Sequence, residues 1–273
     1  MISNATVYSF IIAAIFTLVL PIAILVAAAA KKRVEGLPLL AGAAAFFLSQ
    51  IVLRIPILNA FSGQEWFRSF AEYYVPFILI ISLSAGIFEE SARLGGALLL
   101  KKLSLSEGMS EEGARLGGEL SQKRNRGFKD IVSFGIGHAF CEVIIMVGFT
   151  HINNVVLCMA INGSAGTLAE AFPPDVLEAA AAQLAAVDSF HVYLGIIERI
   201  SAVMFHIFAT ILVFKGVNEE NLQYYVLAIL AHTMFNFIGV FLASYAGLVI
   251  SEAAILVMAI AAGYYVVKKY PRK

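Results

Sequence analysis

Charged side chains are scarce in this chain, because Asp, Glu, Lys and Arg make up only 14% of its 273 residues. Soluble domains usually carry about 25% charged residues, so the scarcity argues against a soluble protein. The 19 basic residues balance the 19 acidic ones, which gives a formal net charge of zero. This balance gives no electrostatic indication of a nucleic-acid partner, and none is expected.

Cysteines and common cofactor motifs are also few or absent. The two cysteines are Cys141 and Cys158, they form no CxxC motif, and Cys141 lies in an apolar stretch where a free buried thiol is expected. The chain has no P-loop, no glycine-rich dinucleotide fingerprint and no HExxH motif. Their absence argues against nucleotide binding and against the usual soluble zinc-protease site.

Long apolar runs are abundant instead, and 60% of the residues are apolar. About 20 consecutive apolar residues are enough to cross the hydrocarbon core of a bilayer as a helix. The predicted fold is therefore an all-α, polytopic helix bundle that forms a single transmembrane domain over residues 1–273, located in a prokaryotic inner membrane. The seven predicted spans are Val7–Ala30, Leu37–Leu58, Val75–Leu100, Ile131–Thr150, Phe190–Phe214, Tyr225–Ala246 and Ser251–Val267.

The distribution of basic residues predicts how the bundle is oriented. Positive residues favour cytoplasmic loops. With the amino terminus outside and the carboxyl terminus cytoplasmic, fifteen of the nineteen Lys and Arg residues lie inside. The five basic clusters that this topology places inside are Lys31–Arg33, Lys101 and Lys102, Arg115 through Lys129, Lys215, and Lys268 through Lys273.

Two connections are long enough to contain structure of their own. The polar segment Lys101–Asp130 has charges at near-helical spacing, which favours a short surface helix over a solvated linker. The segment His151–Ser189 lies outside in the predicted topology. It contains an Ala-rich run, Val176–Val187, that follows Asp175 as a helix cap.

Ionisable side chains inside the spans are the main indication of function. Such groups are costly in a bilayer, so they usually face a protein interior or a wet cavity and carry function. A helical rise of 1.5 Å per residue puts them about 12 to 20 Å from the nearest cytoplasmic charges, on four helices. One shared layer predicts one site, although a buried ion-pair network that only sets helix packing is the alternative. The layer comprises Glu89, Glu90, Arg93, His138, Glu142, His206 and His232.

Spacing within each helix indicates which of these groups share a face. Residues four apart lie on one side of a helix, which applies to Glu89 with Arg93, His138 with Glu142, and His232 with Asn236. Gly135 and Gly137 beside His138 predict a close helix contact. Higher in the membrane, Glu198 is expected in an ion pair, with Arg199 and Arg54 as the nearby cations.

A carboxylate beside imidazoles is the minimal set of groups for activating water. The carboxylate acts as general base, and a metal or a second imidazole polarises the carbonyl. Zinc binds Glu oxygen and His nitrogen and keeps one position open in catalytic sites. The predicted ligand set is His206, His232 and Glu89, with Zn²⁺ as the expected metal and a metal-free glutamate mechanism as the alternative.

Four short motifs in chain order resemble the YhfC family of intramembrane metalloproteases. That family belongs with the CAAX prenyl endopeptidases, the PrsW proteases and the Aph subunit of γ-secretase. The motifs are Phe88-Glu89-Glu90-Ser91-Ala92-Arg93, Gly135 through Glu142, Glu198-Arg199 with His206, and His232-Thr233-Met234-Phe235-Asn236. They lie on helices between about residues 75 and 246.

The resemblance implies a role for each motif. Glu89 and Glu90 would activate water with Arg93 as their fixing partner, and His138 and Glu142 match the second motif. His206 and His232 would bind metal or stabilise the oxyanion, and Asn236 is the polar residue one turn later. The acidic motif is EExxR, one residue shorter than in the prenyl endopeptidases, which argues against a CAAX substrate.

The sequence therefore predicts an intramembrane endopeptidase that acts on a transmembrane or membrane-associated peptide or protein, among membrane lipids. Apolar stripes on every span permit a monomer. Two alternatives stay open at this point. One is a non-catalytic scaffold or immunity-type protein related to the Aph subunit, and the other is an ion-coupled transporter, for which no inverted repeat is visible.

Overall fold

The computed structural model of the chain describes residues 1–111, 127–164, 166, 170 and 172–269. Every regular element within this part of the chain is a helix. The α-helices are α1 (Asn4–Ala14), α2 (Leu20–Ala30), α3 (Gly36–Phe46), α4 (Ile55–Ser62), α5 (Glu65–Ala71), α6 (Tyr74–Glu111), α7 (Phe128–Glu142), α8 (Phe149–Ile161), α9 (Pro174–Ala185), α10 (Ser189–Glu219), α11 (Gln223–Tyr245) and α12 (Leu248–Lys269). Three π-helical segments join consecutive α-helices: Ile15–Val19, Phe47–Arg54 and Val143–Gly148.

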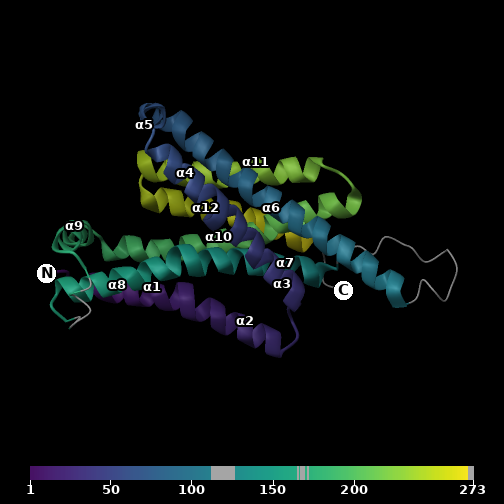
Figure 1. Cartoon of the computed structure of the whole chain (residues 1–273), viewed down its shortest axis with the longest axis horizontal. Coiled ribbons are helices and arrows are strands. Elements are labelled where there is room, and N and C mark those ends of the chain that lie inside the picture. The colour runs from purple at the N-terminus through teal and green to yellow at the C-terminus, as the bar shows by residue number, and fades with distance from the viewer. Residues whose placement is uncertain (112–126, 165, 167–169, 171, 270–273) are drawn as a thin grey trace.

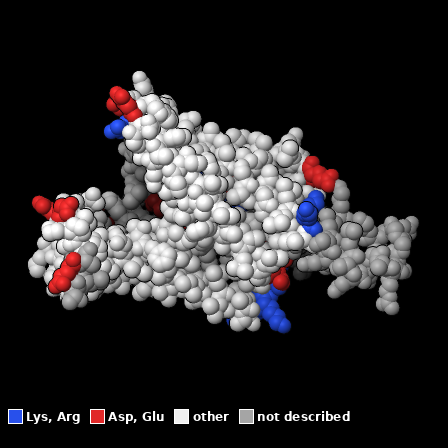
Figure 2. Space-filling view, viewed as in Figure 1, with Lys and Arg blue, Asp and Glu red and all other residues white. Residues whose placement is uncertain are grey.

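In the part of the chain that the structure describes, seven helical stretches are long and apolar enough to cross a membrane, which agrees with the seven predicted spans. The first, second and fourth spans each combine two α-helices through a π-helical segment, whereas α6, α10, α11 and α12 each provide one span. Charged side chains gather at the two ends of the visible face, and its long middle is almost uncharged (Figure 2). The chain is a multi-pass membrane protein.

Helix α10 is the centre of the bundle. In its most apolar stretch 72% of the residues are buried, against 33% or less in the other six spans. Helices α1, α6, α7, α11 and α12 all contact it. A helix surrounded by other helices can carry polar groups on several faces, because none of those faces meets lipid.

Glycines allow two pairs of helices to approach closely. A Cβ atom at Gly137 of α7 would lie 2.0 Å from the carbonyl oxygen of Leu39 in α3, and one at Gly42 would lie equally close to the carbonyl of Phe134. Gly86 of α6 has the same role against Ile229 of α11. These contacts fix α3 against α7 and α6 against α11, the helices that carry most of the polar layer.

The two termini lie at opposite ends of the bundle, as an odd number of spans requires (Figure 1). The short helices α5 and α9 lie near the amino-terminal end, and the α2–α3 connection lies at the other end (Figure 1). The basic cluster Lys31–Arg33 is in that α2–α3 connection. Which end faces the cytoplasm stays a prediction.

Several boundaries differ from the predicted ones. The fourth span continues through α8 to Ile161, beyond the predicted end at Thr150, because the apolar run Val155–Met159 extends the helix. Helix α9 confirms the Ala-rich helix, but Pro173 is its cap residue, and Asp175 lies in the first turn. Helix α6 extends to Glu111, and the rest of the predicted surface helix lies in residues 112–126, outside the described part of the chain.

Candidate active site

The structure brings the seven ionisable residues of the predicted layer into one connected network inside the bundle. They come from α6, α7, α10 and α11. All are buried except Glu142, which is half-buried. Helix packing at the glycine contacts places these four helices close enough for their side chains to meet.

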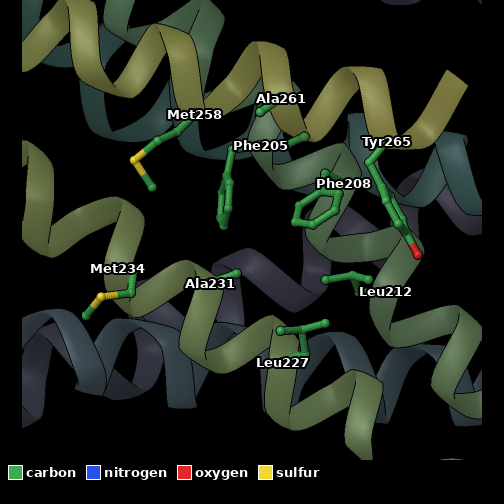
Figure 3. Close-up of a pocket in the computed structure, with 10 residues that line it drawn as sticks. Phe205, Phe208, Leu212, Leu227, Ala231, Met234, Met258, Ala261 and Tyr265 are labelled. Atoms are coloured by element: carbon green, nitrogen blue, oxygen red, sulfur yellow. The ribbon is translucent and has the colours of Figure 1, made fainter. Parts of the chain in front are cut away.

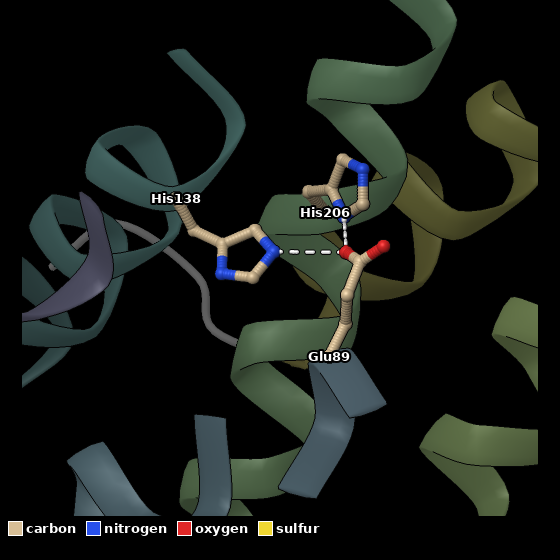
Figure 4. Close-up of side chains that lie close together, drawn as sticks. All are labelled: Glu89, His138 and His206. Carbon is tan, nitrogen blue, oxygen red and sulfur yellow. Dashed lines mark hydrogen bonds and ion pairs between the residues drawn. The ribbon is translucent and has the colours of Figure 1, made fainter. Parts of the chain in front are cut away.

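The centre of the network is a trio formed by Glu89, His138 and His206 (Figure 4). Nε2 of His138 lies 3.0 Å from Oε2 of Glu89, and Nδ1 of His206 lies 3.9 Å from the same oxygen. One ligand atom from each residue lies within 4.8 Å of the other two. Two imidazole nitrogens and one carboxylate oxygen are the donor types of a catalytic zinc site.

Two groups around His206 determine which of its nitrogens carries the proton. Nη2 of Arg93 lies 2.6 Å from Nδ1 of His206, and a guanidinium can only donate, so Nδ1 accepts. Nε2 must then carry the hydrogen, and it lies 2.5 Å from Oε2 of Glu142. Nη1 of Arg199 donates to the other oxygen of Glu142 at 3.0 Å. Glu142 and Arg199 therefore orient His206, as carboxylates commonly do behind metal-binding histidines.

Glu90 has different neighbours from Glu89. Its Oε1 accepts hydrogen bonds from Arg93 and, at 2.7 Å, from Nδ1 of His232, and the side chain is fully buried. The predicted pairing of Glu89 with Arg93 is present as an ion pair at 3.8 Å, and Arg93 makes a shorter contact with Glu90. Glu90, Arg93 and His232 form a buried framework beside the trio.

The ligand set predicted from sequence is only partly brought together. His206 and Glu89 belong to the trio, but His138 takes the third place instead of His232. Nε2 of His232 is 3.8 Å from Oε1 of Glu89, while its other nitrogen is occupied by Glu90. Depth along a helix could be counted from the sequence, but the rotation of α11 about its axis could not. Asn236 follows one turn later on α11 and is half-buried.

Residues 103–260 match the family model described as YhfC intramembrane metalloprotease. The chain belongs to this family. The uncharacterized membrane protein YhfC of Bacillus subtilis (strain 168) is 32% identical over 121 residues, which cover 42% of this chain and 45% of that protein. The chain thus matches about half the length of this relative. No solved structure matches the chain.

The family match covers only part of the network. It includes His138, Glu142, His206 and His232, whereas Glu89 of the trio precedes the matched residues. The assignment to the YhfC family therefore rests on the histidine-bearing helices. The contribution of α6 to the site comes from the geometry alone.

The side chains of the trio fit a metal by donor type, with one competing contact. Glu142 orients His206, Nδ1 of the buried His138 has no hydrogen-bond partner among the described residues, and the donor atoms converge from three helices. The Arg93 guanidinium occupies Nδ1 of His206, so it would have to withdraw before that nitrogen binds an ion. Arg93 is already paired with Glu90 through Nη1, so its charge would stay compensated after Nη2 withdraws from His206.

Two polar residues near the network, Gln50 and Glu252, were not predicted from the sequence, and Arg54 was expected beside Glu198. Gln50 and Arg54 lie on the π-helical segment of the second span, and Gln50 contacts Glu89. Their spacing of four residues within an apolar run was the available signal. Glu252 is buried on α12 and is the only charged residue of the predicted seventh span. Glu198 pairs with Arg199 as expected, while Arg54 bonds to Gln50 instead.

An apolar cavity of about 440 Å³ lies next to the network, between α10, α11 and α12 (Figure 3). Phe205 separates it from the histidines, since its ring lies 5.5 Å from His232 and stacks on Phe235 at 4.4 Å. Among the described residues that line it, Tyr265 is the one with a polar hydroxyl group. Its lining residues are Phe205, Phe208, Leu212, Leu227, Ala231, Met234, Met258, Ala261, Ala262 and Tyr265.

Proposed function

We propose that this protein is an intramembrane endopeptidase in which Glu89 activates the attacking water. The observation that carries the proposal is the contact of Oε2 of Glu89 with His138, within 4.8 Å of His206, in the interior of a membrane helix bundle. A carboxylate in this setting has the partners that general base catalysis needs. The description of the YhfC family as metalloproteases supports the same chemistry.

Glu89 is favoured over Glu90 as the base because Glu90 lies outside the trio and both of its oxygens are enclosed in the protein interior. Arg93 and His232 both donate to Oε1 of Glu90, and the residue has no exposed surface. Glu89 is 5% exposed and directs Oε2 toward two histidines. The second carboxylate therefore holds the framework, and the first is available to the substrate.

The proposed reaction moves one proton from water to Oε2 of Glu89. The water oxygen forms a bond to the scissile carbonyl carbon, and the carbonyl electron pair moves to its oxygen. Collapse of this intermediate breaks the C–N bond, and the proton on Glu89 passes to the leaving amine. Arg93, which lies 3.8 Å from Glu89, supplies positive charge near the developing oxyanion.

Glu89, His138 and His206 are the residues that would hold a zinc ion, and Oε2 of Glu89 would bind either the ion or the proton from water, not both at once. When bound, the metal would polarise the carbonyl and favour hydroxide at neutral pH. Glu142 would keep Nδ1 of His206 directed toward the trio by holding its Nε2 hydrogen. His232 and Asn236, predicted at the site, would support it from α11 through Glu90.

The proposed substrate is a transmembrane or membrane-associated peptide. The trio lies among apolar spans, so a soluble peptide would have to leave water to reach it. A peptide that is already in the bilayer does not have to be transferred out of water. Lipids surround the bundle and would be displaced where such a substrate enters.

A scaffold without catalysis is the second candidate, favoured by the enclosure of the network. Glu90, Arg93 and His138 have no exposed surface, and His206 and His232 have 4% or less. A layer sealed in this way could serve only to fix the helices for partner binding. A hydrolase requires an open form that admits water, which the scaffold does not.

Cleavage of quenched-fluorescent transmembrane peptides by the protein in liposomes distinguishes these two functions. The wild type is expected to cleave at least one such peptide, and Glu89→Gln is expected to lower kcat by about 100- to 10,000-fold, the usual contribution of a general base. Glu252→Gln is the matched control, since it changes another buried carboxylate outside the trio. Absence of cleavage by the wild type would favour a scaffold, and equal, measurable rates in the wild type and Glu89→Gln would contradict the role of Glu89 as the base.

A further inference from the structure

Gln50, on the second span, holds Glu89 and takes no direct part in the proposed reaction. Nε2 of Gln50 donates to Oε1 of Glu89 at 2.9 Å, and Gln50 is 4% exposed. The other oxygen, Oε2, faces His138 and His206. The two oxygens of Glu89 thus have separate environments on separate sides.

Arg54 determines which way the Gln50 amide points. Nη1 of Arg54 lies 3.1 Å from Oε1 of Gln50, and a guanidinium has only donors, so the amide oxygen must face Arg54. The amide nitrogen must then face Glu89, where it can only donate. Arg54 is itself fixed, because it donates to Ser84 at 3.0 Å and to the carbonyl of Ile81 at 2.9 Å.

The backbone that presents these two residues is unusual. Gln50 and Arg54 both lie in the π-helical segment Phe47–Arg54, and Pro56 is the second residue after this segment. Proline lacks an N–H group and clashes with the preceding turn, which explains a local change of helix type. π-Helical turns are found frequently at functional sites.

We propose that Gln50 is a positioning residue for Glu89 and that Arg54 acts through it. Together they hold Oε1 of Glu89 and leave Oε2 as the oxygen that takes the proton from water. This inference rests on the proposed function, since it specifies how the general base is aimed. It also adds the second span, which lies outside the family match, to the machinery of the site.

Two measurements on the full-length protein in liposomes test the arrangement. The first is infrared spectroscopy, in which the carboxylate band of Glu89 is identified by its loss in Glu89→Gln. Gln50→Leu and Arg54→Met are expected to shift this band, because each alters the hydrogen bond to Oε1. Ser49→Ala is the matched control and should leave the band in place, since the buried Ser49 bonds only to the carbonyl of Phe46.

The second measurement is the kinetics of peptide cleavage. Gln50→Leu is expected to lower kcat by about 10- to 100-fold, as is usual when the group that orients a catalytic residue is lost, with KM nearly unchanged. Arg54→Met in the Gln50→Leu background should cause no further loss, because both residues act through one hydrogen bond. Gln50→Asn, which keeps an amide, should recover part of kcat.

The two measurements separate failure of this inference from failure of the proposed function. An unshifted Glu89 band in Gln50→Leu, or wild-type kcat in that variant, would overturn the positioning role while peptide hydrolysis stood. If Gln50→Leu shifts the Glu89 band but the wild type cleaves no peptide, the Gln50–Glu89 contact would be supported and its role in catalysis would be overturned. Additive losses in the double variant would overturn the action of Arg54 through Gln50.

Discussion

Glu89 and Glu90 are adjacent in the chain, yet their side chains meet different neighbours. Consecutive helical residues point about 100° apart, so one carboxylate reaches α7 and α10 and the other reaches α11. Gln50 and His138 contact Glu89, whereas Arg93 and His232 share one oxygen of Glu90. Two identical and adjacent side chains therefore have different hydrogen-bond partners.

Metal content distinguishes the ligand set of the structure from the one expected from sequence. The purified protein is expected to bind about one zinc ion per chain, as a three-ligand catalytic site does. His138→Ala and His206→Ala should lose the ion, while His232→Ala should retain it, because His232 lies outside the trio. Elemental analysis of the purified variants measures this directly.

His191→Ala is the matched control for the zinc measurement, since His191 is exposed at the beginning of α10 and should not affect zinc. If His206→Ala and His232→Ala each lose zinc and His138→Ala retains it, the result would support the ligand set predicted from the sequence. A wild type that binds no zinc after addition of the ion would favour the metal-free glutamate mechanism.

Helix contacts through glycine decide how the elements are placed. Helix α7 carries His138 one residue after Gly137, whose missing side chain lets α3 approach. The same α3 leads into the π-helical segment with Gln50. Close packing at Gly137 therefore brings the helix that carries His138 next to the span that carries Gln50.

Substitution of Gly137 is expected to weaken this contact strongly. The added Cβ of Gly137→Ala would lie 2.0 Å from a backbone oxygen, so α3 and α7 must separate. Overpacking usually lowers the free energy of unfolding by about 1–3 kcal/mol. Because the added Cβ would meet a backbone atom, we expect a loss at the upper end of that range. Reversible unfolding in mixed detergent micelles measures the change in the free energy of unfolding.

Gly95→Ala is the control for this experiment, because nothing lies within 4 Å of a Cβ atom at Gly95 in α6. Alanine is the better helix former by about 1 kcal/mol, so this variant should be as stable as the wild type or slightly more stable. Equal stability of Gly137→Ala and Gly95→Ala would show that the α3–α7 contact is looser than described.

The whole molecule is arranged around one buried helix with its termini at opposite ends. Six spans pack around α10 directly or through their neighbours, and polar groups on α10 face protein instead of lipid. The connection that contains Lys31 lies at the carboxyl-terminal end of the bundle, as the predicted topology requires (Figure 1). The positive-inside rule predicts that this end of the bundle faces the cytoplasm.

Labelling of single cysteines in intact cells tests this sidedness. With Cys141 and Cys158 replaced by Ala, a membrane-impermeant thiol reagent should label Glu72→Cys and should not label Lys31→Cys. Both residues are exposed, and they lie in connections at opposite ends of the bundle. Labelling of Lys31→Cys alone would reverse the orientation, and permeabilised cells, in which both should react, provide the control.

Much of the arrangement could be anticipated from particular residues. The apolar runs predicted seven spans, and the charges inside them predicted a buried polar network that involves α6, α7, α10 and α11. The pairing inside that network could not be predicted. His138 took the place expected for His232, and Gln50 went unnoticed because an uncharged amide in an apolar run is an inconspicuous signal.

The membrane class and the number of spans could be inferred from the sequence alone, which also predicts an approximate depth for each ionisable group. These properties depend on hydropathy and on the constant rise of a helix, both of which are local along the chain. Only the tertiary structure decided which imidazole meets which carboxylate. That choice depends on how far each helix is rotated about its axis, and packing contacts such as those at Gly42, Gly86 and Gly137 set that rotation.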